Sequence, residues 1–241
     1  MTPDFSRRSD LTELMDSDET DFATFRDCLV DLAKVNTLTL AYRPTLQFFD
    51  RLAKTGRLPK DRAAIVLDIG SGFGDMLRVV DRWAKRRGIK VDLTGVDRNP
   101  WSARAAMEAP GRGRAIRFVT ADVFDFQPPR GVDIVISSLF AHHLDEAALV
   151  RFVSWMEMNA EIGWFVNDLH RHPLPFHLFR AFSRTMRFHQ FVQHDGPVSI
   201  ARAFNAADWR RTLAAAGLPP AAAEVRHLFP FRLCVSRVKG R

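Results

Sequence analysis

The spacing of apolar positions along the chain changes near residue 64. Upstream, apolar residues recur at helical spacing over about 21–36 and 40–54, and no strand-like segment is present. Residues 1–60 are therefore predicted to form an N-terminal helical extension that caps the rest of the chain. Within it, residues 1–20 are polar and mixed in charge, and we expect them to be a loosely ordered leader.

Downstream of residue 64, short apolar segments alternate with amphipathic helical segments. Strands are expected at 65–69, 91–96, 116–119, 132–137 and 164–167. Helices are expected between them at 76–87, 100–109 and 144–159. Parallel strands need helical crossovers, so this alternation predicts an α/β fold with a doubly wound, mostly parallel sheet.

The alternation is interrupted at 173–204, which is predicted to be an inserted helical lid. The lid is rich in phenylalanine: Phe176, Phe179, Phe182, Phe188, Phe191 and Phe204. An aromatic stripe is by default the packing face of a helix pair, whereas an apolar lid over a cleft would enclose a flat aromatic or acyl-chain ligand. A helix at 206–216 and an antiparallel C-terminal hairpin at 224–228 and 232–238 then complete a seven-stranded sheet.

The net charge of +7 and the isoelectric point near 10.1 would suit nucleic acid or an acidic membrane surface. The charge is spread out, however, and its tightest clusters, 85–87 and 112–114, fall at an expected helix end and loop, so nucleic acid is not the expected partner. The two cysteines, Cys28 and Cys234, lie far apart, which argues against a disulfide framework. No apolar run reaches the roughly 18 residues of a membrane span. We therefore expect a cytoplasmic protein, with a homodimer left open.

The most informative stretch is Val66-Leu67-Asp68-Ile69-Gly70-Ser71-Gly72-Phe73-Gly74-Asp75, an apolar strand that runs into a glycine turn. Ligands of open α/β sheets bind beyond the carboxyl ends of the strands, where the strand order reverses, and this turn is expected there. Glycines let the backbone approach a ligand closely, and the N–H groups of the following helix can hold a carboxylate. Glycine spacing alone does not separate a nucleoside site from a dinucleotide site.

Acidic residues near the ends of three strands separate these two kinds of site. Asp68 precedes the glycine turn, where it would meet an ammonium and repel a diphosphate. Asp97 ends the second expected strand and suits two ribose hydroxyls, as it would in a nicotinamide enzyme. Asp122 follows the third strand, where it can accept from an adenine amino group while the Val123 N–H faces the ring. Three carboxylates beside bare backbone predict a cationic, phosphate-free nucleoside.

This series resembles the class I methyltransferases that use S-adenosylmethionine. The resemblance covers residues 64–168 in motif order, and 206–238 match the last helix and hairpin of that family. It implies that residues 61–241 are the methyltransferase domain, with the methionine end of the cofactor on the glycine turn. The cofactor-binding residues that it implies are Arg43, Asp68, Gly70, Ser71, Gly72, Gly74, Asp97, Arg98, Asp122, Val123, Ser137 and Ser138.

Histidines follow the fourth and fifth expected strands, at the edge where an acceptor would lie. His142 and His143 are the first candidates for a general base, although His143 could equally brace the next helix. His170, in the run Asn167-Asp168-Leu169-His170, is a third candidate that could equally anchor the lid. None of the histidines shows a metal-ligand spacing with acids or thiols, so no metal site is predicted.

The segment Ser137-Ser138-Leu139-Phe140 stands where family members that methylate nucleobases carry other motifs. Together with the lid, it is similar to bacterial methyltransferases that tailor polyketide, quinone or phenolic metabolites. The expected reaction is methyl transfer to a small hydrophobic, aromatic hydroxylated metabolite, with oxygen favoured as the acceptor atom. Three alternatives stay open: an RNA methyltransferase, a nicotinamide-dependent oxidoreductase, and a non-catalytic relative that only binds the cofactor.

Overall fold

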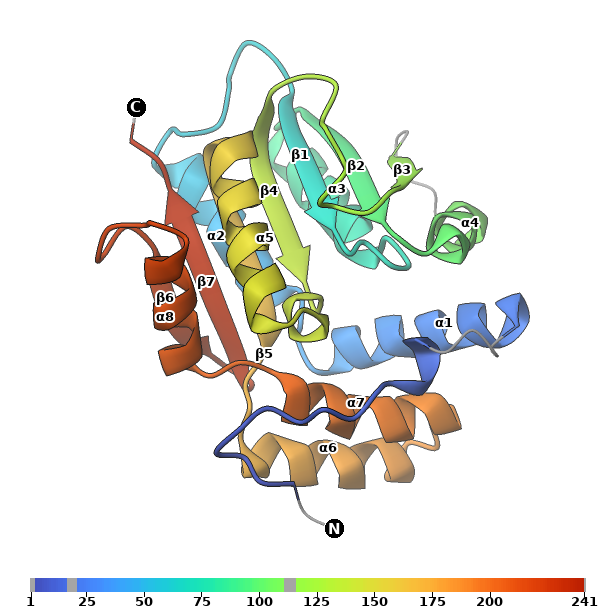
Figure 1. Cartoon of the computed structure of the whole chain (residues 1–241). Helices are drawn as coiled ribbons and strands as arrows, with labels where there is room; N and C mark the ends of the chain where they lie inside the picture. The colour runs from blue at the N-terminus through green and yellow to red at the C-terminus, as the bar shows by residue number, and fades with distance from the viewer. Residues whose placement is uncertain (1–2, 17–20, 111–115, 241) are drawn as a thin grey trace.

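A seven-stranded sheet in the order β3-β2-β1-β4-β5-β7-β6 forms the centre of the protein (Figure 1). The computed structural model describes residues 3–16, 21–110 and 116–240. The strands are β1 (Ala64–Ile69), β2 (Val91–Asp97), β3 (Arg117–Thr120), β4 (Val132–Ser138), β5 (Ala160–Leu169), β6 (Glu224–Leu228) and β7 (Arg232–Val238). The first five are parallel, and β7 is antiparallel to both β5 and β6. The predicted doubly wound sheet with a C-terminal hairpin is confirmed.

Helices cover both faces of this sheet and bury its apolar strands. On one face, α5 (Glu146–Asn159) and α8 (Ala206–Ala215) pack against the strands through residues such as Leu149 and Trp209. On the other face lie α2 (Arg43–Lys54) and α3 (Asp75–Arg87). The helix α4 (Pro100–Glu108) packs with α1 (Phe22–Leu38) in a smaller cluster. Both faces of the central strands are therefore shielded from solvent, which explains their continuous apolar sequence.

The helix α2 packs into the hydrophobic core on one face of the sheet. Phe49 and Leu52 of this helix are fully buried and share a cluster with Trp83 of α3. Residues 1–60 consequently share a hydrophobic core with the segment that follows.

Two elements differ from the expected boundaries. The strand β5 spans ten residues, because Ala160 and Gly163 still pair with β4 and the expected apolar run was only its buried centre. The N-terminal strap, residues 3–16, was expected to be loosely ordered, but it is held by hydrogen bonds and contains a short 3₁₀ helix, η1 (Leu14–Asp16). Residues 17–20 of the expected leader and the basic cluster 112–114 lie outside the described residues.

The inserted segment forms a pair of packed helices, α6 (Pro173–Thr185) and α7 (Gln190–Arg202), as predicted (Figure 1). Its phenylalanines pack the two helices against each other and against neighbouring elements. Phe188 is buried between α7 and α1, and Phe204 belongs to the core of the sheet. None of the described helices is long and apolar enough to cross a membrane.

Replacing Leu149 by alanine tests the core on the α5 face. Leu149 is fully buried, so Leu149→Ala should lower the free energy of unfolding by about 2–5 kcal/mol through lost burial and the cavity left behind. Met158 lies on the same helix with 80% of its surface exposed, so Met158→Ala should change stability by less than about 0.5 kcal/mol. Urea denaturation of both variants measures the difference, and equal losses would contradict the assigned packing.

Candidate active site

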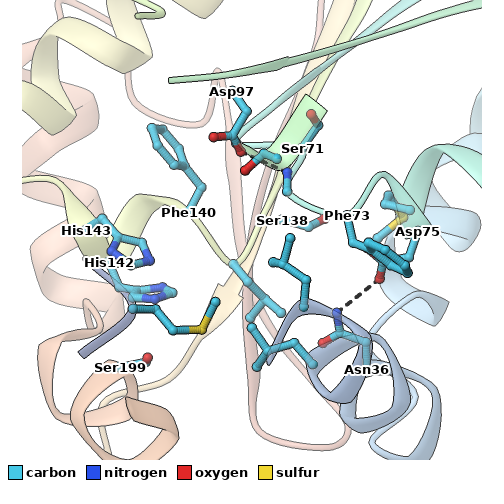
Figure 2. A pocket seen from close by; sticks show the side chains of 18 of the residues that line it. Asn36, Ser71, Phe73, Asp75, Asp97, Ser138, Phe140, His142, His143 and Ser199 are labelled. Atoms are coloured by element: carbon cyan, nitrogen blue, oxygen red, sulfur yellow. Dashed lines mark hydrogen bonds between the residues drawn. The ribbon is translucent and has the colours of Figure 1, made fainter. Parts of the chain in front are cut away.

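A cavity of about 860 Å³ lies at the carboxyl ends of β1, β2 and β4 and continues beneath the lid. The strand β1 pairs with β2 on one side and β4 on the other, so the cavity sits where the strand order reverses. Figure 2 shows His142 and His143 on one side of this pocket, and Asn36 and Asp75 on the other. The glycine turn after β1 and the end of β2 lie between these two sides.

The glycine turn has no room for a side chain at Gly70 or Gly74. Gly70, Gly72 and Gly74 have φ angles of 70°, 46° and 69°, the left-handed region that favours glycine. A Cβ atom on Gly70 would lie 2.6 Å from the ring of Phe140. Gly74 is the N-cap of α3 and does not line the cavity, so its role is to turn the chain into that helix. Ser71 does line it, as predicted.

Asp97 is held in place by backbone N–H groups. Its Oδ2 accepts from Gly72 N at 2.8 Å, and its Oδ1 accepts from Asn99 N at 2.9 Å. Asp122 is fixed in the same way by Phe124 N at 2.9 Å. Both side chains line the cavity, so the acids predicted for ribose and adenine lie on one wall and are oriented before any ligand arrives.

Asp68 is a buried carboxyl with an unsatisfied oxygen. It is 2% exposed, and its Oδ1 has no hydrogen-bond partner among the described residues. Burial raises the pKa of Asp68 well above its usual value, and the nearby charges of Asp75 and Asp97 raise it further. Because Asp68 lines the cavity, it offers this lone pair to a cationic donor there.

The N-terminal helices close the cavity above the glycine turn. Tyr42 OH donates to Asp75 Oδ2 at 2.6 Å. Asn36 Nδ2 donates to the same oxygen at 3.2 Å (Figure 2). Asn36 and Asp75 were not identified from the sequence as site residues, although Asp75 directly follows the glycine motif. Arg43 was, but it is exposed at the start of α2 and does not line the cavity.

Of the other residues predicted to bind the cofactor, some line the cavity and one has a structural role. Arg98, Val123 and Ser138 line the cavity. Ser137 is fully buried, and its Oγ donates to Ile69 O at 2.9 Å, which ties β4 to β1. Its side chain therefore stabilises the sheet edge and does not face the cavity.

His142 and Asp168 form a buried pair at the lid end of the cavity. His142 Nδ1 lies 2.7 Å from Asp168 Oδ1, and His142 N donates to Asp168 Oδ2 at 2.9 Å. Burial alone would raise the pKa of Asp168, but the adjacent His142 and the N–H donors, including that of Leu169, hold it below its usual value. An ionised Asp168 only accepts, so Nδ1 of His142 carries a proton, and in the neutral form of this ring Nε2 presents a lone pair.

The other two candidate histidines differ in position. His143 also lines the cavity, and its ring centroid lies 4.3 Å from that of His142. His170 does not line it and packs instead beside His172 and His227. Burial, followed by the charges of His227 and His172, lowers the pKa of His170 to about 4, so this ring is neutral at physiological pH. The structure thus brings two of the three histidines to the site.

Glu13 of the strap is a site residue that the sequence did not reveal. It is 7% exposed, lines the cavity, and places Oε1 3.7 Å from His142 Nε2. No spacing along the chain links Glu13 with the histidines after β4, so the sequence carried no signal for it.

Comparison with known proteins identifies this arrangement. Residues 66–163, which hold the glycine turn, Asp97, Asp122 and both histidines after β4, match a family described as a methyltransferase domain. This segment of the chain is therefore similar to a methyltransferase domain. The predicted resemblance to class I methyltransferases is confirmed. No curated protein sequence matches the chain.

Solved methyltransferase structures share the fold at low sequence identity. The plantazolicin methyltransferase BpumL in complex with SAH is 12% identical with a TM-score of 0.61, and the match covers 90% of this chain and 95% of that one. Magnesium protoporphyrin IX methyltransferase from Synechocystis PCC 6803 is 16% identical with a TM-score of 0.55 (93% and 90% covered). Human N-acetylserotonin methyltransferase, in complex with SAM, is 14% identical with a TM-score of 0.62 (92% and 57% covered). These likenesses confirm the Rossmann-like methyltransferase fold.

The Asp68→Asn variant tests whether the buried carboxyl of Asp68 lacks a hydrogen-bond partner in the ligand-free protein. Because the folded-state pKa of Asp68 is raised, folding loses stability as pH rises above the unfolded-state value. Asp68→Asn should therefore raise the melting temperature of the ligand-free protein at pH 7.5 by about 2–4 °C, and by less near pH 4.

The matched control is Asp133→Asn. Asp133 is equally buried but accepts from Arg62 and from Ile65 N, so this change should lower the melting temperature. Scanning calorimetry of both variants provides the measurement. A lowered melting temperature for Asp68→Asn at pH 7.5 would show that Asp68 is satisfied in the ligand-free protein.

Proposed function

We propose that this protein transfers the methyl group of S-adenosylmethionine to a hydroxyl oxygen of a small, hydrophobic aromatic metabolite. The observation that carries the proposal is one cavity with two chemically distinct ends. Asp68, the glycine turn, Asp97 and Asp122 lie along one part of it, and His142, which is paired with Asp168, lies at the other. The solved methyltransferases of the same fold were crystallised with SAM or SAH, which supports the cofactor assignment.

The residues of the cavity suit this cofactor. The unsatisfied Oδ1 of Asp68 would accept a hydrogen bond from the ammonium of the methionine end. This bond would offset the free-energy cost of burying the Asp68 carboxyl. The free lone pairs of Asp97 would accept from the ribose hydroxyls, and Asp122 would accept from the adenine amino group. A dinucleotide would place its diphosphate among these carboxylates, so a nicotinamide enzyme fits the cavity less well.

The residues at the lid end would align and deprotonate the acceptor. S-adenosylmethionine supplies a methyl group activated by its sulfonium, whose sulfur keeps the electron pair of the broken carbon–sulfur bond. His142 Nε2 would take the proton of the acceptor hydroxyl, so that its oxygen could accept the methyl group. Asp168 keeps Nδ1–H oriented and stabilises the imidazolium that forms. Alignment is worth up to about 7–11 kcal/mol, and a positioned base adds about 10²–10⁴-fold.

The walls at the lid end favour a flat, apolar acceptor. Phe179, Val192 and Ile200 contribute apolar surface to the cavity at this end, and the lid and strap cover it. Phe179 lies against Gly196 of α7, where a Cβ atom would be 2.0 Å from its ring. A substrate ring would fit between such groups, whereas a base within a folded RNA would first have to enter beneath the lid. These contacts support a small molecule over RNA as the acceptor.

Binding of SAH to the Asp97→Ala variant tests the cofactor assignment. The variant should bind SAH about 1–3 kcal/mol more weakly, because the ribose hydroxyls and Gly72 N lose their acceptor. Asp92 lies at the opposite end of β2 in an ion pair with Arg117, so Asp92→Ala should keep the wild-type affinity. Isothermal titration calorimetry measures all three proteins. Equal affinities for wild type and Asp97→Ala would rule out the ribose contact.

The turnover of the His142→Ala variant tests the base. The variant should form SAH from S-adenosylmethionine and an alkylated phenol, catechol or hydroquinone about 10²–10⁴-fold more slowly, with SAH affinity unchanged. His170→Ala is the control, because His170 does not line the cavity and its loss should leave turnover near the wild-type rate. Full activity of His142→Ala would remove the base from the mechanism. A wild-type protein that binds SAH but methylates none of these acceptors would refute the acceptor class.

A further inference from the structure

We propose that the acceptor carries two hydroxyls on adjacent ring atoms, and that Glu13 of the strap binds the hydroxyl that is not methylated. This inference rests on the proposed function, because it takes His142 as the residue that receives the proton of the reacting hydroxyl. It assigns to the N-terminal strap a part of the acceptor site and a role in substrate selection.

The strap is fixed at several points to elements that surround the lid end of the cavity (Figure 1). Arg8 Nη2 donates to the carbonyls of His142 and Leu144 at 2.9 and 2.8 Å. The N–H groups of Leu14 and Met15 donate to the two oxygens of Asp195 in α7 at 2.8 and 3.0 Å. These anchors lie on both sides of Glu13 in the sequence, so its position is set by contacts to both the histidine loop and the lid.

Glu13 has an oxygen that lacks a hydrogen-bond partner in the described part of the chain. Its side chain is 8% exposed. Oε1 lies 3.7 Å from His142 Nε2 and 3.5 Å from Arg202 Nη1, and Oε2 lies 3.9 Å from His143 Nε2. These are ion-pair distances, longer than hydrogen bonds, and Oε1 has no hydrogen bond. A buried acceptor of this kind is costly unless a ligand supplies the donor.

The spacing of the two acceptors indicates the ligand. His142 Nε2 and Glu13 Oε1 are 3.7 Å apart, and both residues line the cavity. A neutral His142 whose Nδ1–H points to Asp168 presents a lone pair at Nε2 beside the carboxylate oxygen of Glu13. Two hydroxyls on adjacent ring atoms have oxygens slightly closer together than this, so they can donate one hydrogen bond to each acceptor. Hydroxyls on opposite ring atoms are too far apart, and a single hydroxyl has only one hydrogen to donate.

The same three side chains have the chemistry of a metal site, since ligand atoms of Glu13, His142 and His143 lie within 4.8 Å of one another. The guanidinium of Arg202 lies 3.5 Å from the oxygen that such an ion would bind. A divalent cation there would be repelled at short range, whereas neutral hydroxyls would not. This charge favours an organic donor over a metal ion.

The test compares three acceptors that carry the same alkyl chain: a catechol, a phenol and a hydroquinone. The wild-type protein should methylate the catechol with a kcat/KM about 10- to 100-fold above that for the other two, because only the catechol satisfies Glu13. Glu13→Ala should reduce this preference to near unity, and Glu13→Gln should give an intermediate ratio. Asp10→Asn removes an exposed charge from the same strap and should keep the full preference.

Each other outcome has a definite meaning. If the wild-type protein turns over phenol and catechol equally, the second contact is refuted while the proposed function stands. If Glu13→Ala slows all acceptors by the same factor with SAH affinity unchanged, Glu13 only holds the strap, and the inference fails. If dialysis against EDTA removes the preference and Zn²⁺ or Co²⁺ restores it, the contact runs through a metal, which also overturns the proposal. Failure of every acceptor would refute the proposed function itself.

Discussion

The geometry of the site depends on the buried contact between Asp168 and His142. An ionised carboxylate is stable in such a place only when several donors surround it, and Asp168 accepts from the His142 ring, from His142 N and from Leu169 N. These bonds fix the loop after β4 against the end of β5. The loop in turn holds Phe140 against the bare Cα of Gly70, which sets the path of the glycine turn. The two ends of the cavity are therefore coupled through rigid backbone.

Segments far apart in the sequence complete the walls around this centre. The strand ends provide the acids, α1 and the start of α2 close the cavity over the glycine turn, and the lid and the strap enclose the acceptor end. Charged groups are consequently gathered in a small volume. Within the described part of the chain, Asp68 and Glu13 each retain a buried oxygen without a hydrogen bond. Such unsatisfied groups lower the stability of the ligand-free protein, and they make the binding of a hydrogen-bond donor more favourable. A loss of stability of this kind is expected at a binding site.

The parts of the fold that follow a local pattern were predictable. A buried strand that runs into a glycine turn places its last residues at the sheet edge, so Asp68, Gly70 and Gly72 lie at the cavity as expected. Asp97 and Asp122 were predictable for the same reason, since parallel strands end at a common edge. The boundaries of β5 were less clear, because polar residues such as Glu161, Asn167 and Asp168 near its ends interrupt the apolar run.

The sequence by itself determined the strand–helix alternation, the glycine turn and the acids at the strand ends, because each depends on residues within about one element. Only the tertiary structure decided which nearby side chains face the cavity. Ser137 points into the sheet while Ser138 lines the pocket, and His170 turns toward other histidines while His142 meets Asp168. It also brought Glu13 to His142, a contact between distant segments. Such contacts depend on how the strap packs between lid and loop, and no local spacing encodes that packing.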